Sequence, residues 1–189
     1  MAQRQVGPPP LDAGQAPTGQ ASEAPRDGAG ARIHPMENCS IARTLEVLGE
    51  KWTFLVLRDA FRGVRRFEDF IAQTGIPRQV LSNRLSALTS RGILSKQTYR
   101  EPGVRPRAEY VLTAKGSDVY PVLVAMRQWG DRYEADPEGP PLVMLHRDCG
   151  AAVLAHLRCA DGHPVTSADE VTHRPGSGAR LRSVPANEA

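Results

Sequence analysis

The amino-acid sequence predicts a mainly α-helical fold with a small antiparallel β-hairpin. Three observations support this: a leucine stripe at helical spacing after Pro77, a strand-like pattern on both sides of a turn near 101–103, and further apolar stripes before and after them. The chain has 189 residues, of which 40% are hydrophobic. This is enough for one modest core but not for two large ones, so we expect one folded domain with an appendage.

The first element is a helix from Pro77 to about Arg91. Its apolar residues Leu81, Leu85 and Leu88 follow the i, i+4, i+7 spacing of a core-facing stripe. The opposite face carries short or amide side chains that can hydrogen-bond base edges in a major groove, namely Gln79, Ser82, Asn83 and Ser86. Two arginines flank the stripe within reach of phosphate, Arg78 and Arg84. A solvated surface helix has the same pattern and is the alternative.

The pattern of residues 93–99 and 107–112 predicts two strands joined by a turn. Glu101, Pro102 and Gly103 form a sequence that favours this turn. Three arginines crowd the tip of this hairpin: Arg100, Arg105 and Arg107. Guanidinium groups repel one another unless an anion is near, and the phosphate backbone or minor groove of DNA provides one. The alternative is a solvated loop.

Positive charge is concentrated in this part of the chain. The whole protein has a formal net charge of +3, whereas residues 62–107 hold ten Lys or Arg against Glu68, Asp69 and Glu101, a net charge of +7. An attraction to nucleic acid or to an acidic surface follows, and it should weaken with added salt.

Two helices are expected between Ser40 and Arg62, with Ile41, Leu45 and Leu48 as one core stripe of the first. A short strand at 65–67 and a third helix at 68–73 follow, and Arg65 and Arg66 are expected to hold phosphates.

The step from Gly75 to Pro77 fits the corner of a helix-turn-helix, because glycine permits the turn and proline is favoured at the start of the next helix. Helices followed by a basic hairpin, in this order, predict a winged helix-turn-helix, in which the helix after the corner enters the major groove of DNA.

Beyond Thr113, a plausible N-cap, a helix is expected to run to about Tyr133 with a kink at Pro121. Its apolar side chains recur along one side: Val122, Met126, Trp129 and Tyr133. This stripe lies past the compact winged domain, so little core is left for it to cover. We expect it to pair with a second copy, which suits a two-fold operator, and packing against the first helix is the alternative.

Both ends of the sequence are expected to be disordered, at 1–35 and 174–189. The first 35 residues contain six prolines and five glycines among Ala, Gln and Ser, too little apolar surface to offset chain entropy. They have no apolar core of a secretory signal, and no apolar run in the chain approaches the roughly 20 residues that span a bilayer. Three cysteines do not suggest a disulfide framework. We therefore expect a cytoplasmic protein with no membrane partner.

The segment 135–173 carries four residues with metal-ligand chemistry: His146, Cys149, Cys159 and His163. The spacings H-x2-C and C-x3-H resemble zinc knuckles, and residues 142–146 are expected to form a strand. A compact knuckle usually has C-x2-C, which neither pair has. We expect a degenerate, zinc-ribbon-like β-hairpin appendage and no cofactor, with zinc at these four residues as the alternative.

Several ordered motifs point to one family: CSIARTLEVLGEKWT at 39–53, RRF at 65–67, IPRQVLSNRL at 76–85 and RAEY at 107–110. Over about residues 38–131 the chain resembles the HxlR-type winged helix-turn-helix transcriptional regulators. The resemblance implies a dimeric, one-component bacterial transcription factor, often a repressor and sometimes responsive to electrophiles or oxidants.

Cys39 precedes the first expected helix, where the helix dipole stabilises a thiolate and Arg43 adds positive charge one turn later. In the redox sensors that the chain resembles, a cysteine at this position is the reactive one, so Cys39 is the candidate redox-sensing residue. The alternative is a buried small hydrophobe.

The sequence therefore predicts a homodimeric, sequence-specific DNA-binding regulator, a repressor by resemblance, whose inducing signal is unknown. Its rival is a winged helix used as a protein-interaction module without specific DNA readout. We do not expect an enzyme, because the sequence has no nucleophile and base at recognisable spacing, no glycine-rich phosphate loop and no paired carboxylates in an apolar setting.

Overall fold

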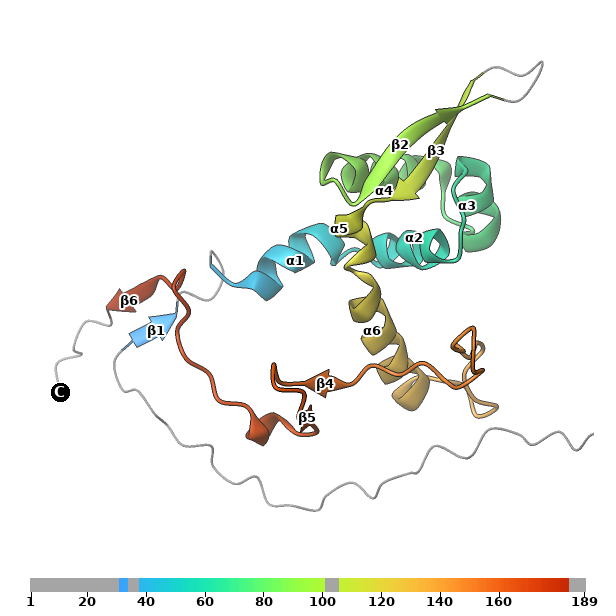
Figure 1. Ribbon diagram of the computed structural model, residues 1–189. Coiled ribbons are helices and arrows are strands. Elements are labelled where there is room, and N and C mark those ends of the chain that lie inside the picture. Colours follow the sequence, from blue (N-terminus) through green and yellow to red (C-terminus); the bar gives the residue numbers. More distant parts are fainter. Residues whose placement is uncertain (1–30, 34–37, 101–105, 184–189) are drawn as a thin grey trace, which may run out of the picture. The chain divides into compact units, whose positions relative to one another are not determined.

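The computed structural model describes residues 31–33, 38–100 and 106–183. In these described residues, four helices precede the hairpin: α1 (Ser40–Leu48), α2 (Lys51–Phe61), α3 (Phe67–Thr74) and α4 (Arg78–Ser90). Strands β2 (Leu94–Tyr99) and β3 (Arg107–Leu112) form the wing, followed by α5 (Ala114–Ser117) and α6 (Tyr120–Tyr133). Figure 1 shows the wing extending past α2, α3 and α4. The predicted winged helix-turn-helix is confirmed.

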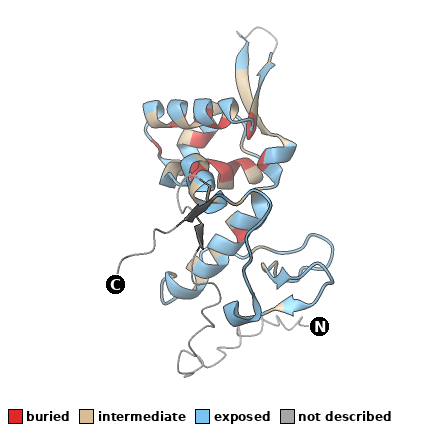
Figure 2. Cartoon of the chain, turned by 90° about the vertical axis from the view of Figure 1, so that its left-hand side faces the viewer, coloured by how far each residue is buried: buried red, intermediate tan, exposed pale blue. Residues whose placement is uncertain are grey.

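The core lies between α2, α3, α4 and the start of the wing (Figure 2). The leucine stripe of α4 is buried as predicted, with Leu81, Leu85 and Leu88 at most 2% exposed. They pack with Phe70 and Ile76, which are also buried. Burying this stripe fixes the rotation of α4, so its polar face is turned to solvent.

The corner between α3 and α4 is built as the sequence predicts. Gly75 has a φ of 66°, the left-handed conformation that glycine adopts without strain, and its N–H donates to the carbonyl of Ile71 (2.8 Å). Pro77 lies one position before α4, as its N-cap. Thr74 links the two sides, since its hydroxyl donates to the carbonyl of Phe70 (2.6 Å) and accepts from the N–H of Ile76 (3.1 Å).

The wing is an antiparallel pair in which Leu94 faces Leu112 and Tyr99 faces Arg107. The expected strand at 65–67 is a single bridge between Arg66 and Glu109, with the N–H of Tyr110 donating to the carbonyl of Arg65 (2.8 Å). Helix α3 already begins at Phe67, so no residues remain to extend this strand.

The prediction that all of the first helix stripe is core was wrong. Leu48 is buried, but Ile41 is 71% exposed and Leu45 is 58% exposed. Periodicity shows that the three residues share a face of α1, but it does not show how much of that face another element covers.

Thr113 caps α5 as predicted, accepting from the N–H of Gly116 through its hydroxyl (3.0 Å). The expected continuous helix with a kink at Pro121 was wrong: the helix is broken between Ser117 and Tyr120. Pro121 falls in the first turn of α6, where its missing N–H leaves no helical hydrogen bond unmade.

The segment after α6 has little regular structure. The strand expected at 142–146 was wrong, since this part forms only a bridge between Leu145 and Ala152. A separate two-residue pair, β4 (Leu157–Arg158) with β5 (Pro164–Val165), makes the short β-hairpin, and a 3-10 helix, η1 (Ala168–Glu170), follows. The segment therefore contains two separate turns, one at 146–150 and one between β4 and β5.

Two three-residue strands, β1 (Ala31–Ile33) and β6 (Leu181–Ser183), pair antiparallel in parts that composition predicts to lack structure. Backbone N–H and C=O groups can pair whichever side chains the residues carry, so the amino-acid composition does not reveal this strand pairing. In the described part of the chain, no helix is long and apolar enough to cross a membrane.

Candidate nucleic-acid interface

The exposed face of α4 carries the three residues predicted to read bases, Gln79, Ser82 and Asn83. The amide of Gln79 donates to the side-chain oxygen of Asn83 (3.0 Å), one helical turn further on. This bond orients both amides along the helix surface and leaves each with further donors and acceptors for a base edge.

Arg78, at the start of α4, is held by Glu68 of α3. Its two terminal nitrogens donate to the two carboxylate oxygens of Glu68, each at 2.7 Å, and its guanidinium lies 5.2 Å from the centre of the Phe67 ring. The hydrogen bond from Arg78 lowers the pKa of Glu68 and raises the pKa of Arg78. The pair joins the two helices of the helix-turn-helix at its solvent side, and the arginine can reach phosphate only by sharing or leaving Glu68.

Arg84 lies partly inside the fold. Its side chain is 27% exposed, one terminal nitrogen lies 3.5 Å from a carboxylate oxygen of Glu50, and its Nε is buried without a hydrogen-bond partner. A phosphate contact by Arg84 stays a prediction, and it would require the ion pair with Glu50 to open.

The base of the wing holds Arg66 between two partners. Its guanidinium stacks on the ring of Tyr99 at 4.4 Å, and its Nε lies 3.5 Å from a carboxylate oxygen of Glu109 on β3. Arg65 beside it is exposed.

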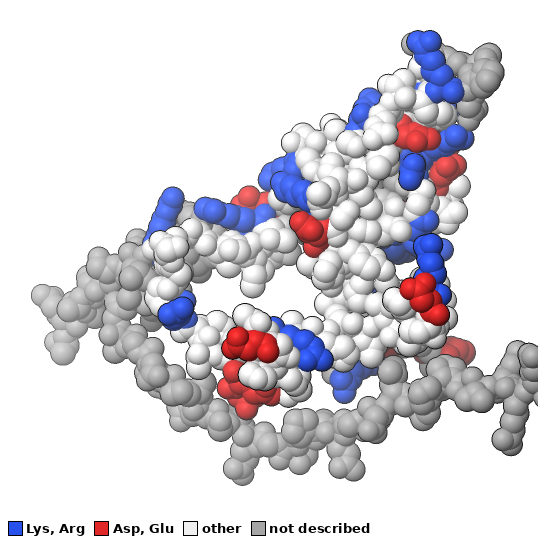
Figure 3. Space-filling model, viewed as in Figure 1, with Lys and Arg blue, Asp and Glu red and all other residues white. Residues whose placement is uncertain are grey.

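Of the three other wing arginines, the structure describes two. Arg100 and Arg107 are exposed, one beyond the end of β2 and the other at the start of β3. Arg105 lies outside the described residues. On the face seen in Figure 3, lysine and arginine side chains are spread over the wing and the helices, with acidic side chains between them.

Sequence reasoning missed the acidic partners of this surface, Glu50, Glu68 and Glu109. Arg78 and Glu68 are ten residues apart, and Arg66 and Glu109 are forty-three apart. Neither separation is a helical or hairpin spacing, so only the tertiary fold brings each pair together.

The stripe predicted to form the dimer is uncovered. On α6, Val122 and Met126 are each 46% exposed, Trp129 is 58% exposed and Tyr133 is 60% exposed. The rings of Trp129 and Tyr133 are packed at a centroid distance of 5.5 Å.

Cys39 is the N-cap residue of α1, with extended backbone angles and no side-chain capping bond. It is half-buried and is not in a disulfide. The predicted position at a helix N-terminus is therefore present, and reactivity of the thiol stays a prediction.

The four predicted metal ligands come together as two pairs. The Sγ of Cys149 lies 3.4 Å from Nδ1 of His146, and the Sγ of Cys159 lies 3.5 Å from Nδ1 of His163. Among the described residues, the only cluster of three or more such groups is Cys159, Asp161 and His163. The sequence reasoning missed Asp161, although it lies inside the C-x3-H spacing.

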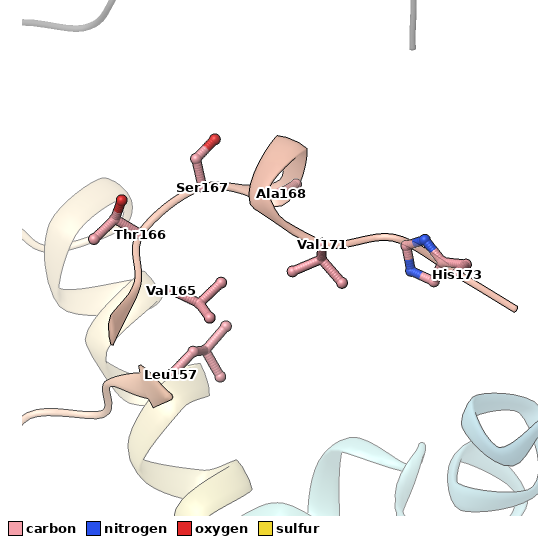
Figure 4. A pocket seen from close by; sticks show the side chains of 7 residues that line it. All are labelled: Leu157, Val165, Thr166, Ser167, Ala168, Val171 and His173. Atoms are coloured by element: carbon pink, nitrogen blue, oxygen red, sulfur yellow. The ribbon is translucent and has the colours of Figure 1, made fainter. Parts of the chain in front are cut away.

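A shallow hollow of about 330 Å³ lies beside this hairpin (Figure 4). The side chains of Leu157, Val165 and Val171 point toward it, and His173 lies at its edge. Leu157 is 73% exposed, so the hollow excludes little water and does not resemble an enclosed ligand pocket.

Known proteins share this architecture and much of this sequence. A model of the HxlR-like helix-turn-helix family matches residues 47–138. Proteins named as HTH-type transcriptional regulators, Rv3095 of Mycobacterium tuberculosis and Mb3122 of Mycobacterium bovis, are each 40% identical over 149 residues, which cover 79% of this chain and 93% of theirs.

Two solved structures are similar to this chain in both fold and sequence. PA1607, provisionally described as a transcription factor, is 34% identical with a TM-score of 0.66, over 75% of this chain and 99% of that one. PA1374 from Pseudomonas aeruginosa, described in the same provisional way, is 37% identical with a TM-score of 0.54, over 75% and 95% of the two chains. The chain belongs to the HxlR-like helix-turn-helix family of DNA-binding transcriptional regulators.

Proposed function

We propose that this regulator is a homodimeric repressor that binds a two-fold operator in double-stranded DNA. The observation that carries the proposal is the exposed amide pair Gln79 and Asn83 on α4, opposite a buried leucine stripe. Such a face can enter a major groove without disturbing the core, and amides can pair with the edge of adenine. Ser82 lies beside them and completes the base-reading set.

The arginines supply affinity that does not depend on sequence. Arg65, Arg100, Arg105 and Arg107 contact phosphates or the minor groove. Arg66 and Arg78 add to this when they share or leave their glutamates. Because phosphate contacts carry no sequence information, contacts from the amides must account for much of the preference for the operator.

Dimerisation places two α4 helices on one operator. The exposed stripe of α6 and the exposed Ile41 and Leu45 of α1 are apolar surfaces that a second copy would remove from water. In a two-fold dimer the half-sites lie about 34–36 Å apart, which is one turn of DNA.

The signal acts through Cys39 in this proposal. Cys39 is the N-cap residue of α1, and oxidation of its thiol would alter the start of a helix that carries part of the apolar surface. The protein would act in the cytoplasm, where its operator and the oxidant meet.

A gel shift of the full chain on its own promoter region tests the proposal. We expect a discrete complex that withstands excess unrelated competitor DNA and that loses affinity steeply with salt. A complex that competitor removes completely would instead favour the protein-interaction module, an alternative supported by the carboxylates that already pair with Arg66 and Arg78. Loss of repression in a promoter reporter strain lacking the gene would separate a repressor from an activator.

A further inference from the structure

The β4–β5 hairpin places a thiol and an imidazole on one face. Leu157 faces Val165 and Arg158 faces Pro164, so the next opposed pair is Cys159 and His163. The N–H of Cys159 donates to the carbonyl of His163 (3.0 Å), which continues the register. Directly opposed residues of an antiparallel pair have side chains on the same face, and here Sγ and Nδ1 are 3.5 Å apart.

The turn between them adds a carboxylate. Gly162 has a φ of 85°, and its N–H donates to the carbonyl of Cys159 (2.9 Å), which closes the turn tightly. The guanidinium of Arg158, on β4, donates to the carbonyl of Gly162 (2.7 Å) and so stabilises the same turn. As a result, ligand atoms of Cys159, Asp161 and His163 all lie within 4.8 Å of one another.

The separation of the Cys159 and His163 ligand atoms fits a tetrahedral zinc ion. With Zn–S near 2.3 Å and Zn–N near 2.0–2.1 Å, a tetrahedral angle separates the two ligand atoms by about 3.6 Å. The Cys159–His163 distance of 3.5 Å agrees with this value. A thiol–imidazole hydrogen bond has a similar length, but it makes no use of Asp161. A thiolate with an imidazole selects zinc over magnesium or calcium, which prefer oxygen ligands.

We propose that Cys159, Asp161 and His163 bind Zn²⁺, with water at the fourth position. This site differs from a four-residue ribbon, because in the part of the chain that the structure describes the His146–Cys149 pair belongs to no cluster of three ligands. The hairpin buries little apolar surface, since every residue from 157 to 164 is exposed. A bound metal would supply the stability that a core does not.

The test measures zinc in the full-length protein after loading and dialysis, by elemental mass spectrometry. We expect about one Zn²⁺ per chain, lost in Cys159→Ser and in His163→Ala, and bound at least about tenfold more weakly in Asp161→Asn. Cys149→Ser is the matched control, because it removes an exposed thiol of the other pair, and it should keep its zinc.

Cobalt gives a second readout that does not depend on a variant folding. Co²⁺ added to the wild-type chain should produce a thiolate charge-transfer band and intense tetrahedral d–d bands, which zinc then displaces. Absence of both zinc and the cobalt band would overturn the proposal. Equal loss in Cys149→Ser and Cys159→Ser would replace it with the four-residue ribbon, and unchanged affinity in Asp161→Asn would remove Asp161 from the site.

Discussion

The guanidinium of Arg78 and the carboxylate of Glu68 form a two-point ion pair, with both N···O distances 2.7 Å, across the two helices of the helix-turn-helix. The pair fixes the first residue of α4 relative to α3. It also means that one of the cations next to the base-reading face already has an anionic partner, before DNA is present.

This pair predicts the titration of Glu68. Because the hydrogen bond from Arg78 lowers the pKa of Glu68, the stabilisation is present at pH values above the ordinary glutamate pKa and is lost as pH falls through the lowered one. A carbon-13 NMR titration of the carboxyl groups should therefore give Glu68 a midpoint below the ordinary value. Arg78→Ala should raise it, and Arg107→Ala, a smaller and purely coulombic influence, should raise it less. If the titration midpoint of Glu68 stayed unchanged in Arg78→Ala, the pairing of these two residues would be contradicted.

The amide pair of α4 predicts a loss of discrimination. Asn83→Ala or Gln79→Ala should relax sequence preference by about 1 to 3 kcal/mol at each base pair that is misread, with the two effects coupled because each amide orients the other. Fluorescence anisotropy with operator variants measures this.

Arg107→Ala and Arg105→Ala serve as the contrast, because each should weaken binding to every DNA sequence alike. Each should also reduce the slope of the logarithm of the binding constant against the logarithm of the salt concentration by about 0.9. If Asn83→Ala instead weakened every sequence equally, the assignment of base reading to Asn83 would be wrong.

The close approach of α5 to the wing predicts a stability difference between two glycines. A Cβ on Gly116 would lie 2.2 Å from the carbonyl oxygen of Ile93 and 3.1 Å from a methyl of Leu112, whereas a Cβ on Gly130 of α6 would meet no described atom within 4 Å. Gly116→Ala should lower the free energy of unfolding by about 1–3 kcal/mol. Gly130→Ala should raise it by up to about 1 kcal/mol, through helix propensity. Urea denaturation compares them, and equal effects would refute the tight contact.

The uncovered stripe of α6 predicts the oligomeric state. Trp129→Glu should convert the dimer to a monomer in analytical ultracentrifugation, since a carboxylate in an apolar interface is costly to desolvate. Gln128→Glu is the matched control, because it adds the same charge away from the stripe. Its carboxylate can still accept from the N–H of Ala155 (2.8 Å), and it loses only the longer donation to the carbonyl of Ala155 (3.4 Å). A Trp129→Glu protein that stays dimeric would show that the interface lies elsewhere.

The N-cap position of Cys39 predicts how the response to oxidants is lost. Cys39→Ser should leave operator affinity intact in reducing buffer, because serine is also a good N-cap, and should abolish release of DNA by diamide or a quinone. The measurement is a gel shift with and without oxidant, with Cys149→Ser as the control that retains release. An oxidant response that persists in Cys39→Ser would end the case for a sensor at this residue.

The local part of the architecture could be predicted because it depends on short-range patterns. The leucine spacing of α4, the glycine at 75 and the cap at Thr113 each act within a turn or two of the chain, so the helix, the corner and the start of α5 follow from neighbouring residues. The wing follows for the same reason, since its two strands are joined by a short connection.

The predictions that were wrong concern burial and continuity. Ile41 and Leu45 share a helical face with Leu48, yet only Leu48 lies against the core. The helix after Thr113 breaks before Pro121, because proline tolerates the first turn of a new helix better than the middle of a long one.

The sequence by itself determined the winged helix-turn-helix, its family, and the positions of the polar residues on α4, because each depends on periodicity and short motifs. Only the tertiary structure decided that Glu68 holds Arg78 and that the side chain of Arg84 lies partly inside the fold beside Glu50. The local turns of the segment after α6 place Asp161 near Cys159 and His163, and Cys149 near His146. The physical reason is that an ion pair between two different elements depends on the distance between their side chains, and folding sets that distance through packing that no local pattern of residues encodes.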